Sequence, residues 1–434
     1  MPMKKLLMLA VAAFAAGSAA AQMNQPIPAD PEVRTGKLEN GMTYYIRHNE
    51  KPKGQADFYI LHDVGAIQEN DSQQGLAHFL EHKLFENEDC DVFDLYAKTG
   101  ASANAFTSFD KTCYFFSCSD NFKASLKILL SFVQSPYFTP ESVAKEQGII
   151  GQEIRMCDDD PGWRVFFNML CGLYQKHPVR IDIAGTIESI AQITDDLLYR
   201  CYRTFYNLHN MVLAVAGNCT VDEVLEVADR LLKPCDDQKL ETVFPEETLD
   251  IVRPETVETA AVGQPLFNLG IKCQPRSGMD NLRAEMQAHI AMLTLSGSSS
   301  LLYQEMLQSG LVNESFSSEV FNGDGFFTMI FGGESRDPKA VREKITAAIL
   351  DAQKNGLDET MFTECKKTTY GNLVREQNNV SAVTNALVAS HMAGCGLYDT
   401  MQVLSEMTLE DCNCFLREEV DVERMTLSII APAK

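Results

Sequence analysis

Alternating hydrophobic and polar positions predict short strands near the start of the chain. Residues 37–46 contain two strand-like segments joined by Asn40-Gly41, a dipeptide typical of a β-hairpin turn. A further segment with strong β propensity runs from Ala56 to Leu61. The chain therefore begins, after its first thirty or so residues, with strands rather than helices.

A helical pattern follows at residues 75–85, where hydrophobic positions recur with the spacing of one helix face. Asp71 and Ser72 precede it, and residues of these types commonly cap the first turn of a helix. We therefore expect a helix over Gly75 to Phe85 that is capped by Asp71 or Ser72.

A second helix is predicted to begin at Thr139 and to end near Met156. Thr139 is a suitable N-cap, Pro140 fits the first helical position, and Glu141 complements the positive end of the helix dipole. Gly148 and Gly151 interrupt this helix at about 1 kcal/mol each relative to alanine. That cost suggests close packing at the two glycines, against the helix at residues 75–85.

The two halves of the chain end alike. Segments 210–217 and 424–431 are both rich in strand-forming residues, and each follows a helical stretch. Between the halves, residues 236–263 are rich in Pro, Asp and Glu and read as a linker. We expect an α+β fold of two similar domains, at 22–235 and 264–434, that arose by internal duplication. Each would combine a mixed or antiparallel sheet with helices packed on it.

The first 21 residues have the pattern of a secretory signal peptide. Lys4 and Lys5 precede an apolar run, and small residues end at Ala21, so Gln22 would begin the mature chain. A membrane anchor is the alternative, but the run is shorter than the roughly 20 residues that span a bilayer. We expect a periplasmic or secreted protein, without stable membrane insertion.

Thirteen cysteines complicate this location. An odd number cannot pair completely, and exported proteins usually hold their cysteines in disulfides, so a cytoplasmic location is the alternative. Most of the cysteines lie among apolar residues, and we expect them to be buried, reduced thiols. The formal charge of −23 argues against nucleic acid as a partner, because phosphates require Lys and Arg to neutralise them.

Three metal-competent side chains occur within five residues, at His78, Glu81 and His82. A helix brings positions i, i+3 and i+4 to one face, so both imidazoles could ligate one Zn²⁺. The intervening glutamate is then offset enough to bind the attacking water. This H-x-x-E-H spacing is the inverse of the commoner H-E-x-x-H metallopeptidase motif.

The helix that Thr139 opens offers the third metal ligand. A catalytic zinc uses three protein ligands and keeps one position for water, and Glu153 is the natural candidate. Glu146 lies two turns earlier on the same face, where it could hydrogen-bond a ligand and hold its orientation. The alternative for each is a surface acid with no role at a metal.

Several motifs together resemble one family, the pitrilysin/insulysin family of inverted-motif zinc peptidases, which includes the mitochondrial processing peptidases. The resemblance is carried by residues 75–82, 100–107 and 146–153, by His177-Pro178 with Gly185-Thr186, and by residues 210–218. The segment from Glu146 to Glu153 is especially similar to a bacterial subgroup whose active chains work beside a metal-free partner chain.

The resemblance implies a zinc endopeptidase that acts on peptides. It implies an αβ roll for each half and a clam-shaped chamber formed by two chains, as a homodimer or as a heterodimer with a metal-free homologue. It implies Zn²⁺ ligation by His78, His82 and Glu153, with Glu81 as the catalytic base and Glu146 in a supporting catalytic role. Asn104 and Ala105 would bind the substrate backbone along a sheet edge; a turn-forming role for Asn104 is the alternative.

One segment departs from the family pattern. Active members of the family that consist of a single type of chain carry an Arg and a Tyr, which approach the substrate from across the chamber. Residues 297–313 of this chain have neither residue where it is expected. A partner chain would have to supply these groups. A second hypothesis is that the protein is a non-catalytic scaffold, which the intact metal motif disfavours. A third is that it is an enzyme that processes one dedicated precursor peptide.

Overall fold

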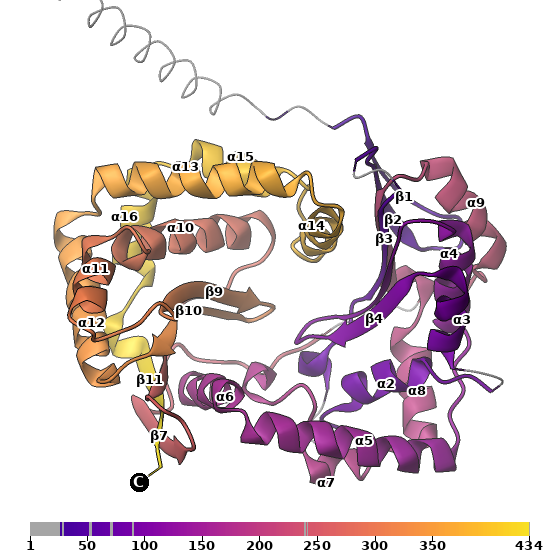
Figure 1. The fold of residues 1–434 in the computed structure, drawn as a ribbon, viewed down its shortest axis with the longest axis horizontal. Coiled ribbons are helices and arrows are strands. Elements are labelled where there is room, and N and C mark those ends of the chain that lie inside the picture. The colour runs from indigo at the N-terminus through magenta and orange to yellow at the C-terminus, as the bar shows by residue number, and fades with distance from the viewer. Residues whose placement is uncertain are drawn as a thin grey trace, which may run out of the picture.

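The computed structural model describes residues 27, 30–51, 54–69, 73–88, 91–237, 240 and 242–433. Figure 1 shows two halves side by side, each with one sheet and its own set of helices. The predicted signal peptide, residues 1–21, and the expected new N-terminus at Gln22 lie outside the described residues.

The N-terminal sheet has six strands in the order β1-β2-β6-β3-β5-β4. They are β1 (Val33–Lys37), β2 (Thr43–His48), β3 (Ala56–His62), β4 (Ser102–Thr107), β5 (Thr112–Cys118) and β6 (Met211–Gly217). The predicted hairpin is confirmed, since β1 and β2 pair antiparallel and Gly41 adopts a φ of 101° in the turn between them. The strands expected at 56–61 and 210–217 are also present.

The helices of this half are α2 (Leu76–Leu84), α3 (Val92–Thr99), α4 (Phe122–Phe132), α5 (Pro140–Asp159), α6 (Pro161–Leu173), α7 (Ile187–Ile190), α8 (Asp195–Phe205) and α9 (Val221–Leu231). The inner face of the sheet and the apolar sides of α2, α4, α5, α8 and α9 share one continuous buried core. Figure 1 shows α2 and α5 near the free edge of the sheet, where β4 lies.

The C-terminal sheet repeats this arrangement in the order β7-β11-β8-β10-β9. Its strands are β7 (Glu255–Ala260), β8 (Leu266–Lys272), β9 (Ser317–Gly323), β10 (Phe326–Glu334) and β11 (Met425–Pro432). Its helices are α10 (Gly278–Ser296), α11 (Leu301–Gln308), α12 (Pro338–Asn355), α13 (Glu359–Glu376), α14 (Val380–Met392), α15 (Asp399–Glu406) and α16 (Leu409–Glu419).

Both sheets contain one parallel pair, β2–β6 and β7–β11, beside antiparallel neighbours, so the expected α+β fold with two similar domains is confirmed. The linker prediction needs correction. Residues 255–260, inside the segment expected to be a linker, form β7 and pair with β11 of the C-terminal sheet. This edge strand was not predicted because residues 236–263 are rich in proline and acidic residues, a composition typical of linkers.

Each half contributes one helix to the other half. Helix α6 follows α5 in the chain but packs on β8 and β11 of the C-terminal sheet, where Gly270 leaves room for Met169 and Leu173. Helix α14 conversely packs on β3 and β6 of the N-terminal sheet, and Val383 and Leu387 are buried there. This exchange makes the two halves one packed unit.

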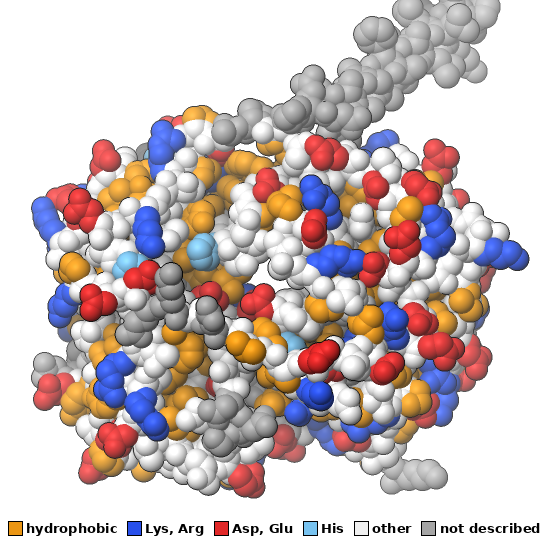
Figure 2. All heavy atoms as spheres, turned by 180° about the vertical axis from the view of Figure 1, so that it is seen from behind, with side chains coloured by type: hydrophobic (Ala, Val, Ile, Leu, Met, Phe, Trp, Pro, Cys, Tyr) orange, Lys and Arg blue, Asp and Glu red, His pale blue; other side chains and the backbone are white. Residues whose placement is uncertain are grey.

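No disulfide joins any two of the cysteines that the structure describes, and many of these thiols are buried. Among the described residues, no helix is both long enough and apolar enough to cross a bilayer. The face of the molecule in Figure 2 carries acidic and basic side chains interspersed, with scattered hydrophobic groups between them.

A buried ion pair joins the two halves. Lys272 on β8 is fully enclosed, and its Nζ lies 2.7 Å from Glu247 Oε1 and donates to the Leu173 carbonyl at 2.9 Å. Glu247 also accepts hydrogen bonds from the backbone N–H groups of residues 175–177. Burial acts to raise the pKa of Glu247, but these hydrogen bonds and Lys272 outweigh it and lower that pKa to about 2.

We predict that Glu247→Gln destabilises the protein at pH 7 by roughly 3–5 kcal/mol, because Lys272 is left as an unpaired buried charge. A carboxylate with a lowered pKa stabilises the fold above its unfolded pKa and loses that contribution as the pH falls through its folded pKa. The stability difference between the two proteins should therefore shrink from pH 4.5 towards pH 2. Denaturant unfolding at several pH values measures it.

Glu226→Gln is the matched control, because Glu226 pairs with Arg230 on the exposed surface of α9. Exposed pairs of this kind contribute about 0–1 kcal/mol. Equal effects of the two substitutions would contradict a joining role for the Glu247–Lys272 pair.

Candidate metal centre

Helix α2 presents two chemically different faces. Phe79, Leu80 and Leu84 are buried in the N-terminal core, whereas His78, Glu81 and His82 share the face towards α5. The helix begins as predicted, but its capping was wrong. Gly75 is the N-cap, at a φ of 85°, and Asp71 and Ser72 lie outside the described residues.

Helix α5 begins as its sequence predicts. The Thr139 hydroxyl accepts from the Ser142 N–H, Pro140 is the first helical residue, and the helix ends at Asp159, three residues beyond Met156. The interpretation of its glycines was wrong. A side chain at Gly148 would meet nothing within 4 Å, and one at Gly151 would contact Ile187 of α7 rather than α2.

Three expected metal ligands lie together where α2 crosses α5. His78 Nε2 is 3.7 Å from Glu153 Oε1, and His82 Nε2 is 3.6 Å from Glu153 Oε2. One nitrogen or oxygen from each of the three residues lies within 4.8 Å of the other two. Two imidazoles and one carboxylate form a donor set that catalytic zinc uses, so these residues fit Zn²⁺.

The ionisation of His78 suits metal binding. Burial, and secondarily the charge of His82, lowers the pKa of His78 to about 3. The imidazole is therefore neutral at physiological pH, and a metal ion need not displace a proton from it. Glu153 is the most exposed of the three, with 45% of its side chain accessible, and leaves one side of the centre open.

Glu146 contacts the side chain of His82, one of the candidate ligands, and does not lie between the three candidate ligands. Its Oε1 lies 3.0 Å from His82 Nδ1, which can donate to it and leave Nε2 free to bind a metal. Glu146 is 8% exposed. This geometry favours a supporting role, exerted through His82.

Glu81 is held by a residue that the sequence motifs did not single out. The hydroxyl of Thr107, the last residue of β4, donates to Glu81 Oε2 at 2.7 Å. Burial raises the pKa of Glu81, and the hydrogen bond from Thr107 opposes that shift. Thr107 closes the 100–107 motif, and this position in the motif was the one signal that could have identified it.

Asn104 and Ala105 lie on β4, the edge strand of the sheet. Asn104 is exposed, and its Oδ1 accepts from the Ala105 N–H at 2.9 Å. Asn104, Glu81 and His82 line one cavity of about 650 Å³. The same cavity is lined by Phe85, Glu86, Asn87, Glu88, Asp91, Phe93, Lys145, Glu146 and Ile149.

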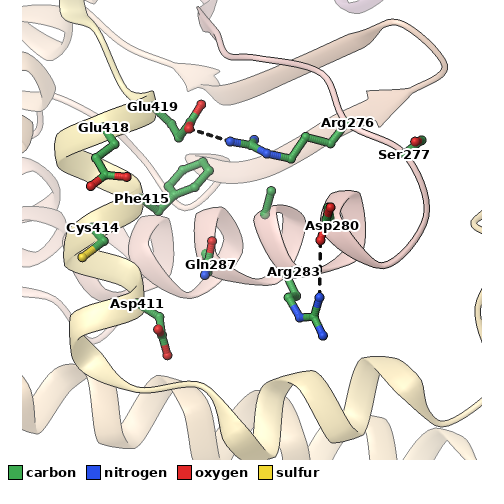
Figure 3. A pocket seen from close by; sticks show the side chains of 11 residues that line it. Arg276, Ser277, Asp280, Arg283, Gln287, Asp411, Cys414, Phe415, Glu418 and Glu419 are labelled. Atoms are coloured by element: carbon green, nitrogen blue, oxygen red, sulfur yellow. Dashed lines mark hydrogen bonds and ion pairs between the residues drawn. The ribbon is translucent and has the colours of Figure 1, made fainter.

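A second pocket, of about 530 Å³, lies between α10 and α16 of the C-terminal half (Figure 3). Its basic groups already have partners, since Arg276 pairs with Glu419 at 2.5 Å and Arg283 with Asp280 at 3.4 Å. Neither helix carries a residue of the metal centre.

The C-terminal counterparts of α2 and α5 are α10 and α13. They enclose a cavity of about 490 Å³, lined by residues that include His289 and Cys365. Among the residues described, His78, His82 and Glu153 are the sole group of three that could hold a metal. The candidate metal-binding residues therefore all lie in the first of the two similar halves.

Comparison with known proteins agrees with this arrangement. Residues 44–187 match the model of the insulinase (peptidase family M16) domain, and residues 192–369 match that of the peptidase M16 inactive domain. The uncharacterized zinc protease YmfH of Bacillus subtilis is 38% identical over 365 residues, which are 82% of this chain and 85% of YmfH. The chain belongs to the insulinase (M16) family.

Solved structures of M16 proteins share the fold. A crystal structure described as an M16-like peptidase from Alicyclobacillus acidocaldarius has a TM-score of 0.90 at 31% identity and covers 94% of this chain and all of that one. The first half of the periplasmic protease PqqL from Escherichia coli has a TM-score of 0.74 at 20% identity, covering 94% and 93%. The family resemblance inferred from the motifs is thus confirmed.

We predict that the purified M16 chain binds about one Zn²⁺ through His78, His82 and Glu153. Substituting any of the three with Ala should abolish tight binding, because a catalytic zinc has three protein ligands. Elemental analysis after dialysis measures the stoichiometry.

Glu81→Gln is the matched control, since Glu81 lies on the same helix face but its carboxylate is held by Thr107. This variant should retain the metal. Zinc-free unmodified protein, or full zinc content in all three ligand variants, would contradict the assignment.

Proposed function

We propose that this M16 chain is a zinc-dependent endopeptidase, which hydrolyses peptides in a chamber formed with a second chain. The convergence of His78, His82 and Glu153 around one point, with Glu81 beside it, carries the proposal. The names of its relatives, which are zinc proteases, support the same activity. A scaffold would not require these four residues to lie together.

The reaction follows from the groups at the centre. Bound Zn²⁺ would supply Lewis acidity, which polarises the scissile carbonyl and lowers the pKa of water. Glu81 takes a proton from the attacking water and delivers it to the leaving amine. Thr107 orients Glu81, and Glu146 keeps His82 in the tautomer that presents Nε2.

The edge of β4 offers a binding site for the substrate backbone. An extended peptide could add to this edge through main-chain hydrogen bonds, with Asn104 and Ala105 in contact with it. Thr107 ends the same strand beside Glu81, so a peptide paired with β4 would pass the catalytic base. Main-chain pairing with β4 requires an extended chain and thus favours unfolded or short peptides.

A second chain would complete the site. Residues 297–313 contain no arginine, and their one tyrosine, Tyr303, is buried in the C-terminal core. Donors that stabilise the developing oxyanion must then come from elsewhere, and such donors are often worth about 2.7–4 kcal/mol. We propose a second copy or a metal-free homologue as their source.

We propose that the protein works outside the cytoplasm, as the signal-like residues 1–21 suggest. PqqL, a structural neighbour, is described as periplasmic. N-terminal sequencing of the exported protein should begin at Gln22, and thiol titration should find most cysteines reduced. A mature protein that keeps Met1 and remains in the cytoplasm would contradict this location.

Peptide hydrolysis tests the catalytic proposal. Glu81→Gln should lower kcat by at least about 100-fold while zinc is retained, because general acid–base catalysis contributes roughly 10²–10⁴-fold. Thr107→Val should lower it less, since the base is still present but less well oriented. Undiminished hydrolysis by Glu81→Gln would refute the role of Glu81.

The dependence of peptidase activity on a second chain tests the proposal of a two-chain chamber. Activity per chain should rise with protein concentration or with an added metal-free homologue and then saturate, because the second wall excludes water and supplies the missing donors. Full activity of a strictly monomeric preparation at nanomolar dilution would show that one chain suffices.

A further inference from the structure

The metal-bearing helix α2 begins without a cap of its own. Its N-cap residue is Gly75, which has no side chain to accept from the first N–H groups. A helix leaves four such N–H groups without intrahelical partners, and burying them unsatisfied costs free energy. His78 is the third residue of this helix, so the order of the first turn directly affects a metal ligand.

A carboxylate from outside the helix satisfies these groups. Glu69 lies just after the short 3₁₀ turn at Ala66–Gln68, and its two oxygens accept from Gly75 N–H at 2.7 Å and Ala77 N–H at 2.6 Å. Glu69 also interacts with the N–H of Leu76. Burial raises the pKa of Glu69, and the hydrogen bonds from these N–H groups oppose that shift. Both oxygens of this one side chain thus meet the positive end of the helix dipole.

The opposite side of the same turn is closed by another segment. A Cβ at Gly75 would lie 2.4 Å from the Ala184 carbonyl oxygen, and one at Gly185 would lie 2.5 Å from the Gln74 carbonyl oxygen. Ser189 donates to that Gln74 carbonyl at 2.8 Å. The segment that contains Gly185 and Thr186 therefore packs closely against one side of the first turn of α2. Glu69 holds the other side of that turn through its hydrogen bonds.

We propose that Glu69 is a positioning residue for the metal centre, which sets the place of His78 by holding the first turn of α2. The inference rests on the proposed zinc site. The N–H groups of Gly75 and Ala77 donate to the two oxygens of Glu69, and together these bonds fix both the rotation and the translation of the turn. Ala77 immediately precedes His78. Without this carboxylate, the first turn can fray and His78 loses its fixed position relative to His82 and Glu153.

A cavity beside Glu69 makes the proposal testable by chemical rescue. Glu69 lines a cavity of about 730 Å³, together with residues that include Lys176 and Arg180. These two basic side chains favour the entry of a small anion. Removing the Glu69 side chain would leave space for formate beside the N–H groups of Gly75 and Ala77.

The experiment measures zinc affinity by competition with a chelator, for the unmodified chain and for Glu69→Gln and Glu69→Ala. Loss of an orienting partner should weaken zinc binding roughly 10- to 100-fold in both variants, as is typical for groups that support metal ligands. Formate should restore affinity in Glu69→Ala, whereas chloride at equal ionic strength should not. Glu69→Gln should not respond to formate, since its side chain still fills the space.

Glu223→Gln is the matched control. Glu223 also satisfies the start of a helix, α9, where its carboxylate accepts from the Thr220 N–H at 3.2 Å, but α9 carries no metal-site residue. This variant should bind zinc as tightly as the unmodified chain. A purely structural role for Glu69 would lower the thermal midpoint of the metal-free protein and leave the zinc affinity of the folded protein unchanged.

Unchanged zinc affinity in folded Glu69→Gln would overturn the inference. If Glu69→Ala does not fold, the Glu69→Gln result decides alone. A weakening in Glu223→Gln equal to that in Glu69→Gln would also overturn it, because any helix cap would then have the same effect. An unmodified chain that binds no zinc would instead refute the proposed function itself.

Discussion

Negative charge concentrated where α2 crosses α5 is the constraint on which the site depends. Glu81, Glu146 and Glu153 lie around two imidazoles, and burial of ionised carboxylates costs free energy unless partners offset it. Thr107 binds Glu81 and His82 binds Glu146, so these two acids are compensated within the protein. Glu153 is more exposed and faces both His78 and His82 across 3.6–3.7 Å, where a divalent cation would bind.

The C-terminal half contributes to the placement of Glu153, a candidate metal ligand. Asp160 ends α5 and caps α6, so the two helices meet at one residue. Because α6 is docked on the C-terminal sheet, the end of α5 that follows Glu153 is anchored to the other half of the molecule. The C-terminal sheet thus fixes the direction of the helix that carries Glu153.

Local signals in the sequence were sufficient for much of the fold. The Asn40-Gly41 hairpin, the Thr139-Pro140 helix start and the two similar closing strands depend on neighbours in the chain, and all are present. The spacing of the H-x-x-E-H motif likewise fixes one helix face before any tertiary contact forms. Glu153 and Glu146 were predicted as site residues because they also share a face of one helix.

What could not be predicted depends on contacts between distant segments. Thr107 reaches Glu81 only because β4 passes α2, and Glu69 reaches the start of α2 only because the 3₁₀ turn at Ala66–Gln68 lies beside that helix. Strand β7 was missed because its polar, edge-strand composition resembles a linker. Gly148 was misread because a glycine in a helix does not reveal whether its surroundings are crowded or open.

The exchange of α6 and α14 also constrains the order in which the chain can fold. The N-terminal sheet is complete in sequence at Gly217, but its outer face stays uncovered until α14, which begins at Val380, has been made. Apolar residues such as Tyr59 and Val212 are exposed for that interval, and exposed apolar sheet surface promotes aggregation. An N-terminal half that folds before α14 docks would therefore present a defined apolar surface.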